Sequence, residues 1–347
     1  MVSRTTKREI EQDRQVASIS PVVFASKSCK DLEQLDRRPE KILQINQFRY
    51  LVALAKERHF GRAAASLGIS QSALSQALRQ FERHFGVPIV QRHQGGFQGF
   101  TREGEAVLAL ARQFIADHDR LLNTNWEDPD AHLTGTLRIA LSPVAMTITS
   151  LLTAPFAAKH PGVKLSVLCK TMPEIERGLK EFEYDIGVTY LDGLTLGGLR
   201  PYTLYEEAYY LLVPRDHPLS ARKSIDWKEV GMLPLCLLSP HLHNRIIIDR
   251  ILASVGIVPQ AVIETNCSLG LFAHMRTGNW LTVVPHSYFY LLGDWVSIRS
   301  IPIVNPSETA TIGLVIHERE PLMPAVRAFV EIAQQTGVGK QLDRYRA

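Results

Sequence analysis

An α/β multidomain fold is predicted for this chain of 347 residues, and three stretches of its sequence predict it. Two helical patterns separated by a glycine turn lie within 60–92, one long helical pattern runs over 101–123, and strands alternate with helices over 135–338. These stretches predict an N-terminal winged helix-turn-helix, a long dimerisation linker helix and a C-terminal α/β domain of two lobes.

The composition is that of a globular protein with several domains. Hydrophobic residues make up 45% of the chain and charged residues 21%, and the length suffices for two or three domains. No apolar run reaches the roughly 18 residues that a membrane span requires, and the charged N-terminus lacks the apolar core of a signal peptide. We therefore expect a cytoplasmic protein, whose scattered cysteines are interpreted as reduced thiols: Cys29, Cys169, Cys236 and Cys267.

Ordered structure is expected to begin near residue 45. Residues 1–44 mix charge, serine and proline without a regular apolar period, and we predict that this extension is disordered. An amphipathic helix built on Phe48, Leu51 and Leu54 then opens a winged helix-turn-helix domain over 45–101.

The stretch 60–92 has the layout of a helix-turn-helix. A small-residue helix ends at Gly68, and a second helix begins after Ser70. Leu74, Leu78 and Phe81 recur there at helical spacing and can face a core. The opposite face is polar and nearly free of acids, as a helix in a DNA major groove would be, and consists of Gln71, Ser72, Ser75, Gln76 and Arg79.

The charge of this region favours a DNA-binding domain over an ordinary helical domain whose polar face is simply exposed to solvent. Segment 46–92 has seven lysines and arginines, Arg62 among them, against two glutamates, a net charge of +5, whereas the whole chain carries +4. A local basic patch of this kind attracts phosphates.

The residues that follow predict a wing. A short apolar strand, a glycine-rich tip and a second strand span 86–101. A plain surface hairpin is the alternative, but a hairpin directly after a basic helix-turn-helix favours a wing that lies over the DNA backbone or the minor groove. Its candidate contacts are Arg92, His93 and Thr101.

The linker, residues 102–134, combines a helix with a polar hinge. Apolar positions recur at alternating steps of 4 and 3, a period of 3.5 that is typical of a coiled coil. Because the preceding domain is too small to bury this stripe, we predict a dimer whose seam includes Val107, Ala111, Phe114, His118 and Leu121.

The region 135–338 predicts a sheet with helical crossovers. Strands at 135–141, 163–168 and 184–189 alternate with helices, which indicates a parallel sheet, and further strands are expected at 209–213, 234–238, 261–264, 281–284 and 310–316. About 200 residues allow two lobes. We assign lobe I to about 135–203 and 303–338, lobe II to about 204–302, and a C-terminal tail to 339–347.

Together these residues resemble a LysR-type transcriptional regulator over about 45–338. The most specific part is FGRAAASLGISQSALSQALRQFERHFGVPIVQR followed by FTREGE; GTLRIAL, KHPGVKLSV, FEYDIGV and VPRDHPLS resemble phrases of the family's effector domain. The resemblance implies a two-lobed effector domain similar to type II periplasmic binding proteins, DNA contacts at Gln71, Ser72, Ser75, Gln76 and the wing residue Arg92, and assembly into tetramers.

Two positions depart from the family pattern. Gln76 stands where arginine is common, which removes a bidentate partner for guanine and suits adenine better. The wing has Ile89-Val90-Gln91-Arg92 where the family usually has Leu-Phe before Glu-Arg, so an apolar strand is kept and one acid is lost.

A ligand crevice is expected beyond the carboxyl ends of the strands, between the lobes. Hydroxyls and helix N-termini there favour an anion, and Lys170 adds positive charge, so a small organic acid is the predicted effector. Each Ser or Thr alone is more simply an N-cap; only their convergence predicts a site. The candidates are Ser142, Pro143, Lys170, Thr171, Met172, Thr189, Ser239, Asn266 and Cys267.

No cofactor, metal or catalytic group is predicted. Cys169 and Cys267 lie near the crevice, but the close resolving pair of a peroxide sensor is absent, and His241 and His243 are interpreted as part of a capped surface loop. No nucleophile elbow, dinucleotide fingerprint or phosphate loop supports an enzyme.

We therefore predict a regulator that binds promoter DNA, pairs with itself as dimers and tetramers, responds to an anionic effector and contacts RNA polymerase, without a membrane. The alternative is a solute sensor or enzyme domain with a helical tail and no specific DNA binding.

Overall fold

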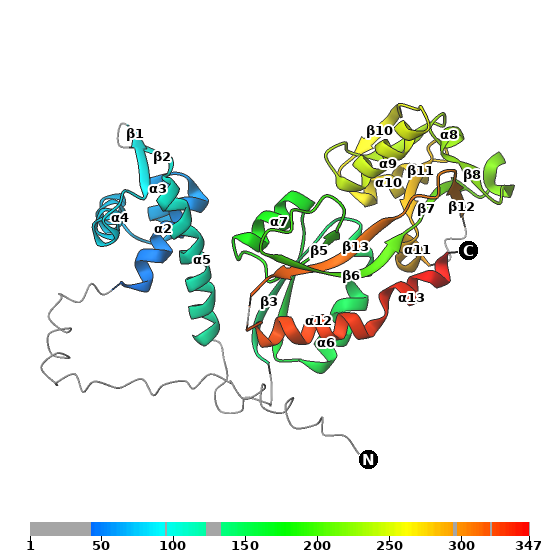
Figure 1. The fold of residues 1–347 in the computed structure, drawn as a ribbon. Helices are drawn as coiled ribbons and strands as arrows, with labels where there is room; N and C mark the ends of the chain where they lie inside the picture. The colour runs from blue at the N-terminus through cyan, green and yellow to red at the C-terminus, as the bar shows by residue number, and fades with distance from the viewer. Residues whose placement is uncertain (1–42, 94–95, 123–132, 294–296, 320, 347) are drawn as a thin grey trace, which may run out of the picture.

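The computed structural model describes residues 43–93, 96–122, 133–293, 297–319 and 321–346. They form a small helical domain with a hairpin, one long helix and a larger α/β domain, the order that the sequence predicts (Figure 1). Residues 1–42 of the predicted extension and 123–132 of the predicted hinge lie outside this description. No helix in the described part is long and apolar enough to cross a membrane.

The small domain is a winged helix-turn-helix. Gly68 forms its turn in the left-handed region, with φ +67°, and Ser70 caps the second helix by accepting a hydrogen bond from the Ala73 N–H at 3.1 Å. Leu74, Leu78 and Phe81 are buried, as their spacing predicts. The elements are α2 (Ile45–Glu57), α3 (Phe60–Ser66), α4 (Gln71–Phe85), β1 (Val90–His93) and β2 (Gly96–Phe100).

Part of the apolar stripe of the linker helix α5 (Arg102–Leu122) is buried in the winged helix, and part is exposed. Ala111 is fully buried in the core of the winged helix, and the ring of Phe114 lies 5.1 Å from that of Phe48. The expectation that the small domain leaves this helix unburied is therefore wrong for its first half. Leu110 and Leu121 remain 65% and 56% exposed, and the dimer stays a prediction.

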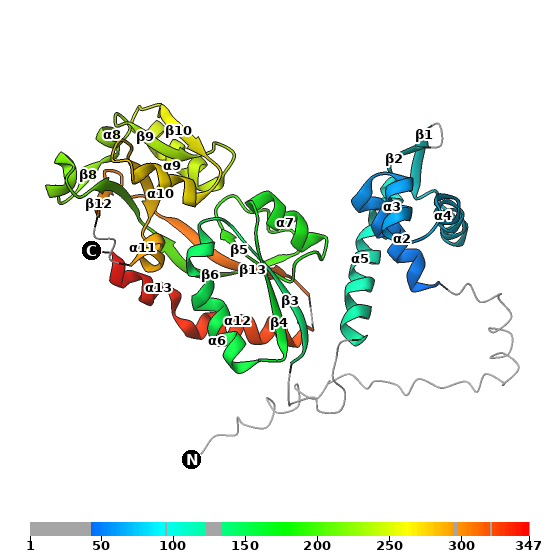
Figure 2. The same ribbon diagram turned by 180° about the vertical axis from the view of Figure 1, so that it is seen from behind.

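The first lobe holds a five-stranded sheet in the order β4-β3-β5-β13-β6. Only β4, β3 and β5 run parallel, because β13 pairs antiparallel with both β5 and β6, so the expected parallel sheet is mixed. Helices α6 (Thr149–Lys159) and α12 (Pro324–Thr336) pack together on one face, and α7 (Met172–Lys180) covers the other (Figure 2). The strands are β3 (Gly135–Leu141), β4 (Val163–Cys169), β5 (Ile186–Tyr190), β6 (Leu199–Glu207) and β13 (Ala310–His317).

The second lobe holds a four-stranded sheet in the order β11-β7-β12-β8 and a parallel pair β9-β10. Its strands are β7 (Tyr209–Pro214), β8 (Ile225–Asp226), β9 (Leu235–Leu238), β10 (Ala261–Thr265), β11 (Thr282–Pro285) and β12 (Ile298–Val304). Its helices are α8 (Trp227–Val230), α9 (His243–Ser254), α10 (Ser268–Met275) and α11 (Ser287–Leu292).

Two connections join the lobes: β6 continues into β7 through Ala208, and β12 continues into β13 through 305–309. Neither β6 nor β12 was among the strands expected from the sequence. The predicted tail begins within α13 (Val338–Leu342), which packs on β6 with Leu342 fully buried.

Candidate nucleic-acid interface and ligand cleft

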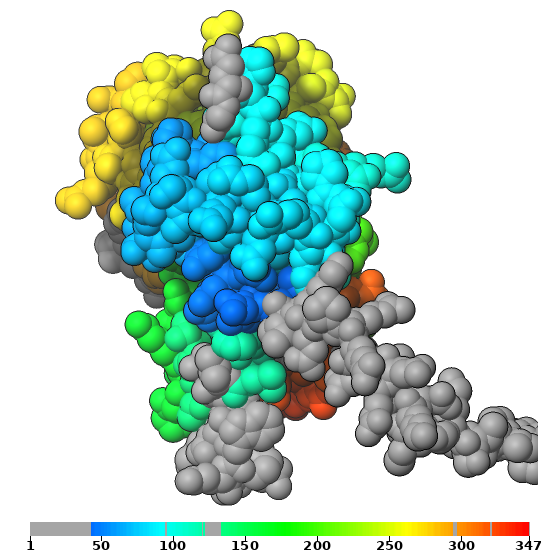
Figure 3. Space-filling view, turned by 90° about the vertical axis from the view of Figure 1, so that its left-hand side faces the viewer, coloured from blue at the N-terminus to red at the C-terminus, as the bar shows by residue number. Residues whose placement is uncertain are grey.

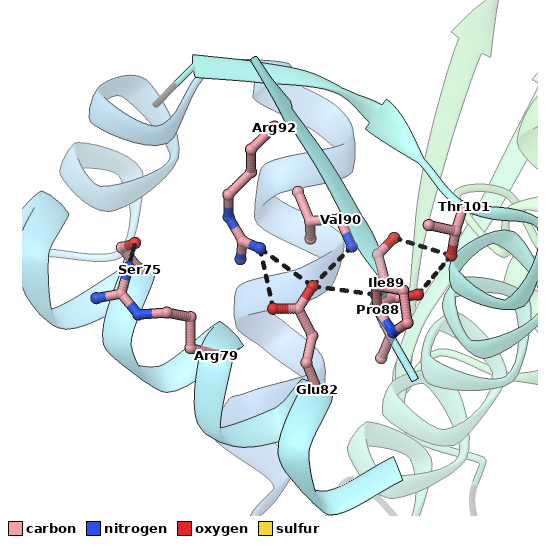
Figure 4. A network of polar contacts seen from close by, with 8 residues as sticks. All are labelled: Ser75, Arg79, Glu82, Pro88, Ile89, Val90, Arg92 and Thr101. Carbon is pink, nitrogen blue, oxygen red and sulfur yellow. Dashed lines mark hydrogen bonds and ion pairs between the residues drawn. The ribbon is translucent and has the colours of Figure 1, made fainter. Parts of the chain in front are cut away.

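The outer face of α4 carries the polar residues that the sequence predicts there. Gln71, Ser72, Gln76 and Arg79 are exposed and Ser75 is half-buried, all on the side opposite Leu74 and Leu78. Arg79 Nη1 donates to Ser75 Oγ at 3.0 Å, which links two of them (Figure 4). In the view from this side, the winged helix stands in front of the α/β domain, which leaves this surface accessible (Figure 3).

Glu82 ties α4 to the wing. Its Oε1 accepts hydrogen bonds from the backbone N–H groups of Ile89 at 3.0 Å and Val90 at 2.9 Å, and both its oxygens accept from Arg92 Nη1, at 3.2 and 3.0 Å (Figure 4). The Arg92 guanidinium carbon also lies 5.7 Å from the ring centroid of Phe60. Arg92 therefore points into the domain, whereas the sequence predicts that it contacts DNA.

Thr101 is also occupied within the domain. Its hydroxyl donates to the Pro88 carbonyl at 2.7 Å and accepts from the Gly104 N–H at 2.9 Å, which fixes the start of α5 against the wing. His93 is exposed at the end of β1, and the Arg62 side chain is 65% exposed while its Nη2 donates to the Glu57 carbonyl at 2.7 Å. The tip residues 94 and 95 lie outside the described part of the chain.

A signal for the direction of Arg92 was present in the sequence. Side chains two apart on a strand share a face, and Arg92 lies two residues after the buried Val90. Gln91 and His93 alternate outward.

A small cavity, partly open to solvent, lies between the lobes at the carboxyl ends of β3, β5 and β9. Both lobes contribute to its walls, which are formed by Ser142, Pro143, Val144, Thr171, Met172, Tyr190, Leu238, Leu242, His243 and Asn244. Four of the predicted effector residues thus come together there: Ser142, Pro143, Thr171 and Met172. Ser142 Oγ is buried and has no hydrogen-bond partner in the described part of the chain.

The other predicted effector residues are not among those that line the cavity. Thr189 is fully buried beside Tyr190, Lys170 Nζ lies 3.8 Å from Glu174, and the Ser239 N–H donates to the Thr265 carbonyl. Asn266 and Cys267 are exposed at the start of α10.

Two helices begin at the cavity. Thr171 caps α7: its N–H and hydroxyl donate to Glu174 Oε2 at 2.8 and 2.7 Å, which holds the pKa of Glu174 below its usual range. Helix α9 begins at His243, whose ring lies 4.8 Å from that of Tyr190. His243 thus lies at the start of a helix and is half-buried rather than part of a surface loop, and burial lowers the pKa of this imidazole.

The cavity and the linker helix touch opposite ends of α7. At its C-terminal end, Glu181 Oε1 lies 3.0 Å from Arg112 Nη2 of α5. Beside it, Arg319 lies 3.0 Å from Asp117 of α5 and over the ring of Phe182. Helix α7 thus extends from the cavity wall to the linker helix.

Free cysteines lie at the end of β4 and directly before α10. Within the described ranges no three His, Cys, Asp or Glu side chains gather as metal ligands would. Cys169 and Cys267 are exposed free cysteines, and burial raises the pKa of Cys169.

Comparison with known proteins agrees with this architecture. Residues 45–105 match the family described as bacterial regulatory helix-turn-helix protein, lysR family, and residues 130–337 match the family described as LysR substrate binding domain. The Escherichia coli K12 regulator YnfL, itself uncharacterised, is 25% identical over 299 residues, which cover 83% of this chain and 96% of the relative.

Solved structures share the fold over almost the whole chain. A variant of full-length OxyR from Pseudomonas aeruginosa has a TM-score of 0.65 and 22% identity and covers 86% of this chain and 97% of its own. Full-length CbnR, crystallised with its target DNA, has a TM-score of 0.57 and 21% identity and covers 85% of this chain and 100% of its own. Members of this family are regulators rather than enzymes. Because the two family matches span both domains, this chain belongs to the LysR family of DNA-binding transcriptional regulators.

Proposed function

We propose that the chain binds promoter DNA through the outer face of α4, and that a small organic acid in the cleft between the lobes regulates this binding. The observation that supports the first part is the exposed row Gln71, Ser72, Gln76 and Arg79, held at a fixed angle to the wing by Glu82. Amide side chains at these positions suit adenine edges, and Arg79 and Arg62 suit phosphates. CbnR, which shares this fold, was crystallised with its target DNA, and this supports DNA binding by the present chain.

The unpartnered hydroxyl of Ser142 is the observation that supports an effector in the cleft. A buried hydroxyl without a partner is costly, and a ligand in the cavity that it lines would supply the missing hydrogen bond. The N-termini of α7 and α9 also meet the cavity, and helix N-termini favour a carboxylate. Lys170, Thr189, Ser239, Asn266 and Cys267 form the second layer in this proposal.

The regulator acts as an oligomer in this proposal. Leu110 and Leu121 of α5 form an apolar edge that a second linker helix would bury, and two such dimers make a tetramer. Effector closes or rotates the lobes, and α7 carries the movement to Arg112 of α5. A changed angle between paired winged helices then alters promoter bending and contact with RNA polymerase.

DNA binding is tested with a duplex selected from a random pool by the full chain. Replacing Gln76 with Ala is expected to lower affinity for that duplex about tenfold and relax specificity at one position. Gln335→Ala, an exposed glutamine on α12, is the matched control and should leave affinity unchanged. Equal affinity of both variants would mean that Gln76 does not contact the bases, whereas failure of the full chain to select any duplex would favour the alternative, a solute sensor without specific DNA binding.

Effector binding is tested by thermal shift of the full chain against a panel of small carboxylates and neutral metabolites. A carboxylate that binds the cleft raises the unfolding temperature of the wild-type protein and raises it less in Ser142→Ala. Stabilisation by neutral compounds alone would contradict the organic-acid class.

A further inference from the structure

A buried carboxylate lies behind the cleft, where β6 leaves the first lobe. Glu207, the last residue of β6, has no exposed surface. The Tyr190 hydroxyl donates to its Oε2 at 2.9 Å, and Tyr205 and Ser287 donate to its Oε1 at 3.0 and 3.3 Å. The ion pairs found in the described part of the chain do not include Glu207, so hydroxyl groups alone bind it there.

The hydrogen bonds of Glu207 join the two lobes. Tyr190 and Tyr205 belong to strands of the first sheet, whereas Ser287 follows β11 of the second. Asn244 of α9, also in the second lobe, donates from Nδ2 to the Tyr190 hydroxyl at 3.0 Å. Glu207 therefore sits at a connection between the lobes and holds groups from both.

The same network reaches the effector cavity. Tyr190 and Asn244 both line the cavity and both belong to the chain of hydrogen bonds that ends at Glu207. A ligand that shifts the Tyr190 ring would alter its hydrogen bond to Glu207, and one that engages the Asn244 amide would alter the donor that orients the Tyr190 hydroxyl. Occupancy of the cavity and the charge of Glu207 are thus thermodynamically linked.

Both charge states of Glu207 are accessible near neutral pH. Burial raises its pKa from 4.5 to about 7, although the three hydroxyl donors act in the opposite direction. The ionised carboxylate accepts from all three hydroxyls, whereas the protonated group must donate through one oxygen. The bond to Ser287 of the second lobe is the longest of the three and is the one we expect to be lost.

Other titratable groups surround this site on every side. The tyrosines stay neutral because burial raises their pKa values, and burial lowers the pKa of His286 to about 4. His286 flanks the connection itself, since its backbone N–H donates to the Ala208 carbonyl. The groups that face Glu207 or its connection are Tyr190, Tyr205, Tyr209, Tyr288, His286, Arg346 and Asp343.

We propose that Glu207 is a proton-linked positioning residue, whose protonation state sets how the second lobe is held against the first and is coupled to occupancy of the cavity. The coupling to the cavity rests on the proposed effector function, whereas the lobe movement does not. Protonation loosens the hold on the second lobe, and ionisation restores it. The regulator then senses effector and pH through one network.

The test follows the distance between the lobes in the full chain without any ligand. Spin labels are placed at Lys164→Cys of the first lobe and Val258→Cys of the second, in a chain whose native cysteines are serine, and labelled chains are diluted into unlabelled ones. The inter-label distance distribution is expected to shift between about pH 5.5 and pH 8.5 with a midpoint of about 7. Glu207→Gln, which keeps the shape and removes the charge, is expected to stay at the low-pH distribution throughout.

Glu206→Gln is the matched control, because Glu206 is exposed and lies next to Glu207, so the variant removes the same charge from the surface. Its distance distribution should shift with pH as that of the wild type does. If Glu207→Gln fails to fold, Tyr205→Phe serves instead, since the loss of one donor to the carboxylate should move the midpoint upward. A distribution that does not change with pH in the wild type, or one that shifts equally in Glu207→Gln, would overturn the proposal. Absence of any ligand in the thermal-shift panel would contradict the effector function and leave this result standing.

Discussion

The guanidinium of Arg92 lies against Glu82 and the ring of Phe60, and this position gives it a part in holding the wing on the domain. Glu82 is mostly buried and would keep two backbone donors but lose its cation without Arg92. A charge left without its partner inside a domain is more costly than the same pair at the surface.

Replacing Arg92 with Ala is expected to lower the free energy of unfolding by about 1–3 kcal/mol, because it removes a charge-assisted hydrogen bond from a mostly buried carboxylate. Chemical denaturation of the variant and of Arg83→Ala, an exposed arginine on α4, gives the comparison. If Arg92→Ala kept full stability and lost only DNA affinity, the residue would be a DNA contact after all.

Glu207 is expected to make the free energy of unfolding depend on pH. Its pKa is higher in the folded chain, about 7, than the ordinary 4.5, so the folded state binds the proton more tightly. The stability it contributes is fully present below pH 4.5 and is lost as pH rises through 7. The unfolding free energy of the wild type minus that of Glu207→Gln should fall over this window by on the order of 1–3 kcal/mol.

His286 acts in the opposite direction, since its lowered pKa removes stability as pH falls through about 4. Both proteins carry His286, so the difference between them isolates Glu207. A difference that stays constant from pH 4.5 to pH 8 would mean that Glu207 does not titrate in this range.

At the scale of elements, the start of α5 is held against the wing by a very close approach. A Cβ added at Gly104 would lie 2.1 Å from the Ile89 carbonyl oxygen, which is backbone and cannot move aside. Only glycine therefore allows the linker helix to begin where Thr101 fixes it.

Gly104→Ala is expected to destabilise the winged helix by about 1–3 kcal/mol, despite the better helix propensity of alanine, because the helix start must shift away from the wing. Gly197→Ala is a suitable reference, since a Cβ added there would meet no atom of the described residues within 4 Å. The measurement is the thermal unfolding temperature of each variant. Equal temperatures would show that the backbone at Ile89 shifts at little cost to accept the added Cβ.

The exposed edge of α5 predicts how chains pair. Lysine at Leu110 and Leu121 would place charge in the proposed seam and is expected to weaken the dimer at least tenfold. Leu269→Lys on the second lobe, where the leucine is 77% exposed, controls for a general effect of charge. Sedimentation equilibrium measures both, and an unchanged assembly would place the dimer contact elsewhere.

At the scale of the whole molecule, α7 connects the cavity to the linker helix through the pair Glu181–Arg112. Glu181→Arg is expected to change the affinity of the full chain for its selected duplex several-fold, and the swapped pair Arg112→Glu with Glu181→Arg should restore it. Fluorescence anisotropy with Glu183→Arg, an exposed neighbour, as reference separates this contact from net charge. Failure of the swapped pair to restore affinity would mean that the contact does not carry the signal.

Helices and strands could be predicted best where the apolar residues follow one regular pattern. Leu74, Leu78 and Phe81 set the recognition helix, and the apolar runs of β3 and β5 set the centre of the first sheet. Strand β6 was missed because a proline and several polar residues interrupt its pattern. Glu207 and His243 were missed because their burial depends on both lobes, which lie far apart in sequence.

The inward position of Arg92 also bears on the ions that surround DNA. Each phosphate neutralised by a protein cation releases about 0.9 of a bound counterion, and this release makes affinity fall with salt concentration. Arg92 forms an ion pair with Glu82, and if it keeps this pair on DNA it releases no counterion when the complex forms. The salt dependence of DNA binding is then expected to depend on outward cations such as Arg79, and an Arg92 variant that still folds should keep the same slope.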